Sequence, residues 1–497
     1  MLFPTLDFAV FFIILVLAIS WLLRPHEIPW KLFLLASSYF FYGSWDARFL
    51  ILIIFVTLIN YVMAIQISRS DKQSHRNLFL FLALAASLGV LGFFKYYNFF
   101  REPLNFLASK VSTGFEIPII EIILPVGISF FTFQAMSYTI DVFRKQIEVD
   151  MSPVGMLDFF VYIAFFPQLV AGPIVRARTF IPQLRDRLVK TVGDNHLALS
   201  LILGGLFKKV VLSSYLQNHI VDKVLQTPLN YSPLEILLAI YAFSVQIYCD
   251  FSGYSDIAIG VALLMGFRFP DNFNSPYRAV SITDFWRRWH ITLSTWLRDY
   301  LYIPLGGNRR GRARTYINLM LTMLLGGLWH GASLSFVVWG GLHGLALAVH
   351  KFWTDFKEKR NINFSDSWFY SGISRFISII ITFHFVSFLW VFFYHKDFSN
   401  AIAVFEGLVS FEKVTPAIEL YIVIAIAFGL SLHFIGDAIS RLYMKIQQFF
   451  TTGFPFSLHS LTRYLGGSFQ VLHNTIIMIV IIKMSPDIVP PFIYFQF

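Results

Sequence analysis

Two histidines in the middle of the chain have the surroundings expected of catalytic groups. His330 follows the apolar run 317–325 and lies between glycines in Gly326-Gly327-Leu328-Trp329-His330-Gly331. An ionisable side chain inside so apolar a segment is costly and marks a functional site by default. The glycines would let another group approach the imidazole closely. We therefore predict that His330 is catalytic; the alternative is a neutral histidine that hydrogen-bonds a neighbouring helix.

The second histidine, His290, ends the run Asp284-Phe285-Trp286-Arg287-Arg288-Trp289-His290. Trp286, Trp289 and Trp296 would share one face of a continuous helix. Such a helix, anchored by tryptophans and by arginines whose charged ends reach water, could lie at the membrane surface, and that alternative remains open.

The stretch 302–310 favours a binding site over a surface anchor. It contains a proline, two glycines and two arginines, which fit a re-entrant loop that presents backbone N–H groups and cations together. Such a surface suits the phosphates of a nucleotide-bearing donor. We predict that Arg309 and Arg310 bind the donor, together with Trp289 and Trp329.

These residue types are suited to acyl transfer. Histidine accepts a proton near neutral pH, and a desolvated imidazole stays neutral and available as a base. Transfer from a thioester to a hydroxyl needs such a base and a group that stabilises the developing oxyanion. The chain contains no Gly-x-Ser-x-Gly motif, and its single cysteine, Cys249, has no obvious base partner. Direct transfer without a covalent enzyme intermediate is therefore favoured.

Other polar residues in apolar segments have simpler interpretations. Asp250 and Asp256 interrupt the stretch 234–265, and a structural ion pair is favoured over a role in orienting a histidine. His343 is expected to pack or to lie at an interface. Cys249 is expected to be a small packing residue, and one cysteine excludes an intramolecular disulfide and a cysteine-rich metal site. We expect no metal centre.

The elements that position these residues are membrane helices. Of 497 residues, 56% are hydrophobic and 14% are charged, and 57 are phenylalanine. A soluble domain has roughly 25% charged residues. The pattern predicts an all-α polytopic membrane protein with roughly ten to twelve membrane helices. The clearest candidates are 8–23, 49–67, 78–100, 234–265, 376–394, 417–435 and 471–482.

The region from about 120 to 350 differs from the plain spans on either side of it. It places Pro, Gly and charged residues at membrane depth, as in Pro125-Val126-Gly127 and Phe166-Pro167. Broken backbone is tolerated there only inside protein or along a cavity. This region should therefore form the catalytic core, and 365–497 should return to ordinary spans.

The distribution of charge predicts the orientation of the chain. Basic residues concentrate in 176–190, 287–314 and 351–360, which should be cytoplasmic, whereas the N-terminus should be outside and its first helix retained. The net charge of +10 does not indicate nucleic-acid binding, because the basic residues are interleaved with membrane segments.

The ordered motifs resemble those of the membrane-bound O-acyltransferase family. They are Asp284–His290, Tyr300–Gly307 and Gly327–Gly331, supported by Pro125–Gln134, Phe166–Pro173 and Asp250–Gly260. The resemblance covers roughly residues 1–350 and is strongest to a bacterial branch that acetylates alginate and related exopolysaccharides. It implies one domain over 1–497, with tilted helices and re-entrant segments around a central funnel or tunnel. It also places the family's invariant histidine at His330 and its second conserved position at His290.

The resemblance further implies a reaction, a donor and a location. A multi-pass protein of the bacterial cytoplasmic (inner) membrane would take an acetyl group from acetyl-CoA. It would deliver the group, through a periplasmic partner protein, to a polysaccharide such as alginate. His330 would act as the base, and His290 would bind or orient the thioester. Acyl transfer to peptidoglycan and transfer of D-alanyl groups to teichoic acid remain alternatives. So do a proton-coupled transporter or flippase, which would move an intact substrate, and a non-catalytic scaffold, which would tolerate loss of both histidines.

Overall fold

The computed structural model describes residues 5–110, 116–170, 172–186, 192–360, 368–410, 418–435, 459–486 and 489–493. Every regular element in these ranges is a helix. Five of the helices are long and apolar enough to cross a membrane: Glu27–Arg69, Gln73–Lys110, Asp194–Leu225, Pro233–Leu264 and Gly372–Tyr394. Five shorter apolar helices are Asp7–Leu23, Pro153–Ala164, Phe398–Val409, Leu420–Ile435 and Leu472–Met484. The predicted class, an all-α polytopic membrane protein, is confirmed.

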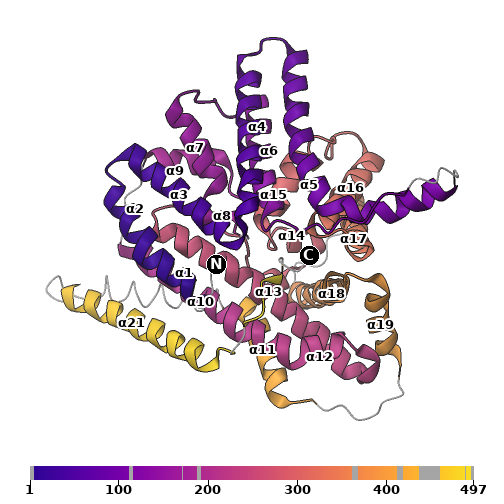
Figure 1. Ribbon diagram of the computed structural model, residues 1–497. Helices are drawn as coiled ribbons and strands as arrows, with labels where there is room; N and C mark the ends of the chain where they lie inside the picture. The colour runs from indigo at the N-terminus through magenta and orange to yellow at the C-terminus, as the bar shows by residue number, and fades with distance from the viewer. Residues whose placement is uncertain are drawn as a thin grey trace. The chain divides into compact units, whose positions relative to one another are not determined.

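The described chain forms two compact units, and the prediction of a single domain stays a prediction. The first comprises residues 1–195 and 258–270. Within it, α4 and α5 run side by side and pack on each other (Figure 1). Its helices are α1 (Leu6–Val10), η1 (Phe11–Leu17), α2 (Ala18–Leu23), α3 (Glu27–Asp46), η2 (Ala47–Phe49), α4 (Leu50–Arg69), α5 (Gln73–Lys110), α6 (Ile128–Phe143), α7 (Pro153–Ala164), α8 (Phe166–Leu169) and α9 (Ala177–Asp186).

Two of the motifs that carry the family resemblance pack on each other inside this first unit. Gly127 caps α6 with φ of 74°, and a Cβ there would lie 2.4 Å from the backbone oxygen of Leu169. Only glycine suits this combination of left-handed backbone and close approach. The described residues of the segments 125–134 and 166–173 therefore contribute to the packing of this unit.

The second unit comprises residues 196–257 and 271–497 and contains both candidate catalytic histidines. Helices α10 and α13 continue from one unit into the other. The helices are α10 (Val192–Leu206), η3 (Phe207–Ser213), α11 (Ser214–Leu216), η4 (Gln217–Val221), α12 (Asp222–Leu225), η5 (Pro228–Asn230), α13 (Pro233–Leu264), η6 (Pro276–Arg278), α14 (Ile282–Trp286), α15 (Ile291–Leu297), η7 (Arg298–Tyr302), α16 (Arg312–His330), α17 (Leu334–Lys359), α18 (Trp368–Tyr394), α19 (Phe398–Val409), Leu420–Ile435 and α21 (His459–Met484).

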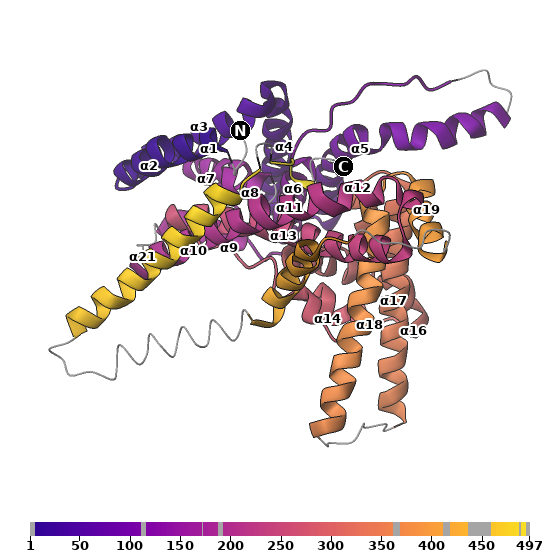
Figure 2. The same cartoon turned by 90° about the horizontal axis from the view of Figure 1, so that it is seen from below.

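Helix α17 packs along α16, and α18 runs beside this pair and packs on α17 (Figure 2). Glycines bring the first two into backbone contact. A Cβ on Gly327 would lie 2.2 Å from the carbonyl oxygen of Phe336, and one on Gly340 would lie 2.4 Å from that of Met323. This close packing holds the end of α16, where His330 lies, against the start of α17.

Candidate active site

His330 is the last residue of α16 and is enclosed by aromatic rings. It is 4% exposed, which confirms its predicted burial. The centroids of Trp329, Trp339 and Phe393 lie 5.0, 5.1 and 5.1 Å from that of its imidazole. The imidazole is therefore enclosed by aromatic rings and shielded from bulk water. Its catalytic role stays a prediction.

The glycine after His330 has a packing reason. A Cβ on Gly331 would lie 2.1 Å from Cε2 of Phe336. That ring stacks over His330 with a centroid separation of 6.5 Å. Gly331 therefore lets the ring of Phe336 close over the imidazole, as the glycine-rich sequence indicated.

The backbone contact between α16 and α17 makes a first prediction. Gly327→Ala should destabilise the protein by about 1–3 kcal/mol, because its methyl group meets a carbonyl oxygen that cannot move alone. Unfolding in mixed micelles would measure the loss. Gly341→Ala is the matched control, since its Cβ would lie 3.5 Å from Cδ2 of Leu324, an ordinary contact. Equal stability of the two variants would contradict the assigned packing.

His290 lies at a break between α14 and α15, with φ of 42° and ψ of 55°. The expectation that three tryptophans share one continuous helix is therefore wrong. Asn272 fixes the chain directly after the left-handed His290. Ile291 donates its N–H to the carbonyl of Asn272 at 3.0 Å, and the hydroxyl of Thr292 donates to Oδ1 of Asn272 at 2.9 Å. Such strained non-glycine residues persist where the surroundings over-determine them, often at active sites.

Trp329 connects the two histidines. Its ring centroid lies 5.9 Å from that of His290 and 5.0 Å from that of His330. His290 is fully buried and also meets Phe251 edge-to-face at 4.6 Å. Burial lowers the pKa of His290, which lies in a turn outside the candidate spans, to about 3. His290 is therefore neutral near pH 7 and suited to hydrogen bonding with a polar substrate.

The predicted donor-binding residues lie in different surroundings. Trp289 is 1% exposed and packs against Trp390 and Phe273, with ring centroids at 4.8 and 5.0 Å. The interface alternative for this residue is therefore wrong, because Trp289 is inside the protein. Arg309 and Arg310 are exposed in the turn before α16. Binding of a donor by these residues and by Trp329 stays a prediction.

The predicted ion pairs are confirmed. Nζ of Lys209 pairs with the buried carboxylate of Asp250, and Nζ of Lys208 lies 2.5 Å from Oδ2 of Asp256. The pair also holds residues close to the C-terminus. Asp250 accepts the N–H of Ile493 at 2.8 Å, and Lys209 donates to the carbonyl of Pro490 at 2.9 Å.

The segment 489–493 thereby becomes part of the wall of the site. The ring of Phe492 stacks on Tyr254 with centroids 4.5 Å apart and lies 5.7 Å from that of Phe251. Phe251 in turn packs against His290. No motif in the C-terminal third of the sequence indicated this contact.

A basic cavity of about 730 Å³ was not predicted from the sequence. Four arginines and one carboxylate line it: Arg278, Arg287, Arg288, Arg375 and Asp284. Arg288 donates to Asp284 at 2.9 Å, so the cavity keeps a net positive charge. The run Asp284–Arg288 pointed to part of this set, but Arg375 lies at the start of a plain apolar span.

An aromatic column leads from this cavity towards His330. Trp286, next to Arg287, lies 5.1 Å from His343 and 5.7 Å from Trp339. Trp339 packs on His330. His343 is fully buried between these tryptophans, so its predicted packing role is confirmed and the interfacial one is wrong.

Known proteins are similar to this chain over most of its length. The model of the membrane-bound O-acyltransferase family matches residues 34–395. A peptidoglycan O-acetyltransferase of Helicobacter pylori is 37% identical over 78% of this chain and 75% of its own length. A probable alginate O-acetylase of Pseudomonas syringae is 44% identical over 65% of this chain and 61% of its own length. A teichoic acid D-alanyltransferase of Bacillus subtilis is 30% identical over 55% of this chain and 70% of its own length.

Proposed function

Since the chain belongs to the membrane-bound O-acyltransferase family and is a multi-pass membrane O-acyltransferase, we propose that it transfers acetyl groups from acetyl-CoA to a cell-envelope polysaccharide. It would work in the bacterial cytoplasmic (inner) membrane with a periplasmic partner protein. The observation that carries the proposal is the pair of buried histidines on either side of Trp329.

The reaction needs only one base and one polar group beside the thioester. His330 removes the proton from the acceptor hydroxyl, and the oxygen attacks the thioester carbonyl. The C–S bond breaks, the acetyl group forms an ester, and the proton passes to the leaving thiolate. His290 hydrogen-bonds and orients the thioester, which stabilises negative charge on its oxygen.

The names of the relatives support acetyl as the group transferred. The relatives named for O-acetylation of peptidoglycan and of alginate are 37% and 44% identical to this chain, against 30% for the D-alanyltransferase. Peptidoglycan and an alginate-like exopolysaccharide are therefore the candidate acceptors, and the exopolysaccharide is the leading one.

The basic cavity is suited to the phosphates of the donor. Four arginines line it, and a guanidinium group can form bidentate hydrogen bonds with a phosphate. His350, in the lining, is eleven residues from Trp339 on α17, about 16 Å along the helix axis. A donor anchored at the cavity therefore needs an extended arm, such as that of CoA, to bring its thioester to His330.

Arginine substitutions test which surface binds the donor. Arg287→Gln with Arg375→Gln should raise the KM for acetyl-CoA by about tenfold or more, because charge-assisted hydrogen bonds are lost, while kcat changes little. Arg309→Gln with Arg310→Gln tests the site predicted from sequence in the same assay. A rise in KM confined to the second pair would place the donor on the exposed turn.

The decisive experiment uses the full chain in proteoliposomes with labelled acetyl-CoA. An acyltransferase releases free CoA thiol and passes the label to the acceptor. A transporter would instead accumulate intact label inside the vesicles without thiol release, and that result would overturn the proposal.

A further inference from the structure

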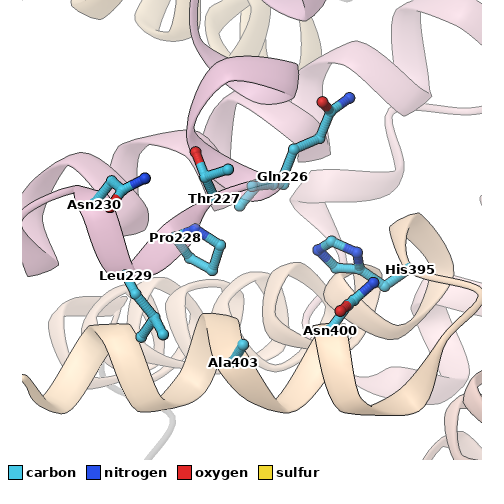
Figure 3. Close-up of a pocket in the computed structure, with 9 residues that line it drawn as sticks. Gln226, Thr227, Pro228, Leu229, Asn230, His395, Asn400 and Ala403 are labelled. Carbon is cyan, nitrogen blue, oxygen red and sulfur yellow. The ribbon is translucent and has the colours of Figure 1, made fainter.

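A second cavity of the same unit, of about 530 Å³, differs chemically from the basic one. Four carboxamides, one carboxylate and a phenol contribute to its lining: Gln217, Gln226, Gln246, Asn400, Asp222 and Tyr394. An adjoining cavity of about 280 Å³ shares Gln226, His395 and Asn400. Figure 3 shows His395 and Asn400 beside each other, facing the segment 226–230. The volume of the larger cavity lies within the range that is usual for small-molecule sites, about 300–1,000 Å³.

The two chemically different cavities lie at opposite ends of α18. Tyr394 follows Arg375, in the basic cavity, by nineteen residues, about 28 Å of helix. That length is close to the thickness of a hydrocarbon core, about 30 Å. The predicted cytoplasmic location of the basic segment 351–360 therefore predicts an extracytoplasmic location for the carboxamide-lined cavity.

Two side chains of this cavity each bury a polar atom that has no hydrogen-bond partner in the part of the chain that the structure describes. Gln246 is 4% exposed and His395 is 8% exposed. Oε1 of Gln246 and Nε2 of His395 have no hydrogen-bond partner among the described residues. Buried polar groups in folded proteins are nearly always paired. A bound polar ligand would satisfy both.

Other groups in the lining are already held in place. Asp222 accepts hydrogen bonds from the Tyr394 hydroxyl at 2.8 Å and from Nε2 of Gln217 at 3.1 Å. Phe243 meets Tyr394 edge-to-face at 5.1 Å. Pre-positioned groups of this kind reduce the entropy lost when a ligand binds.

The chemistry of the lining selects the ligand class. Carboxamides carry both donors and acceptors, as hydroxyl groups do. Asp222 is the one carboxylate in the described lining, which includes no lysine or arginine. An anionic ligand would meet the negative charge of Asp222 without a cation to offset it. An uncharged polyhydroxyl compound fits, whereas a uronate or a phosphodiester does not.

We propose that this cavity binds an uncharged saccharide unit. Tyr394, in the lining, directly follows Phe393 in α18, and the ring of Phe393 packs on His330 with centroids 5.1 Å apart. An uncharged saccharide is distinct from a polyuronate acceptor such as alginate, and its binding here does not rest on the proposed function.

Calorimetric titration of the full-length protein in detergent tests the site, with cellotetraose and maltotetraose as neutral probes and a mannuronate tetramer as the anionic one. At least one neutral probe should bind at least about tenfold more tightly than the uronate. Gln246→Leu and Asn400→Leu should each weaken that binding about tenfold. Asn218→Leu, an exposed neighbour outside the lining, is the matched control.

Each result decides the proposal. Absence of binding by both neutral probes, equal or tighter binding of the uronate, or unchanged affinity in both Gln246→Leu and Asn400→Leu that unfold like the parent protein would overturn it. Thiol release from acetyl-CoA, measured separately, tests the proposed function. Thiol release without saccharide binding would refute this cavity alone, and saccharide binding without thiol release would refute the acyltransferase reaction alone.

Discussion

His330→Gln should lower the rate of acetyl transfer by about a hundredfold to ten-thousandfold, the usual contribution of a general base. Glutamine approximates the size of histidine and keeps hydrogen-bonding groups, but it cannot accept a proton at neutral pH. The aromatic rings around position 330 should hold it in nearly the same place. The measurement is transfer of labelled acetyl by purified protein in proteoliposomes, at saturating donor.

His219→Gln is the matched control for this experiment. His219 is exposed and stacks on Tyr215. It is distant in sequence from the aromatic residues that surround His330, and its ring contact is with Tyr215 rather than with them. It should retain the parental rate. A His330→Gln protein that unfolds like the parent and keeps more than about a tenth of its activity would exclude His330 as the base.

Much of the site could be predicted from local sequence because its signals are local. A histidine beside glycines in an apolar run is expected to be buried and closely approached by another group. His330 is buried, and Gly331 lets the ring of Phe336 pack close to it. Likewise, acidic residues inside an apolar helix are expected to form ion pairs, and Asp250 and Asp256 each pair with a lysine. Cys249 is a buried packing residue, as expected.

The other half of the site depends on contacts distant in sequence. Trp390 and Phe393 enclose the candidate site from α18, whose sequence resembles any apolar span. Nothing in that pattern distinguishes a ring that packs on histidine from one that meets lipid. The break at His290 depends on Asn272, eighteen residues earlier, so periodicity alone favoured a continuous helix. Arg375 joins the basic cavity only through folding.

Lys209→Met should destabilise the protein by roughly 3–5 kcal/mol, because it leaves the carboxylate of Asp250 buried and without its cation. Both side chains are almost fully buried, at 2% and 3% exposed. The variant also loses the hydrogen bond to Pro490, so the segment 489–493 should loosen. Unfolding in mixed micelles measures the first effect, and proteolysis by a carboxypeptidase measures the second.

The double variant Lys209→Met with Asp250→Leu separates charge from packing. Replacing both members of a buried pair with apolar residues of similar size is often nearly neutral, so most of the lost stability should return. The C-terminal segment should stay loose, because Ile493 then has lost its acceptor on Asp250. Arg48→Ala, at an exposed pair with Asp46, should leave both readouts unchanged. If the double variant were as unstable as Lys209→Met, the cause would be packing around position 209. The double variant could instead regain resistance to carboxypeptidase. The contacts of Phe492 with Tyr254 and Phe251 would then be sufficient to hold the segment 489–493, and the ion pair would contribute only to stability.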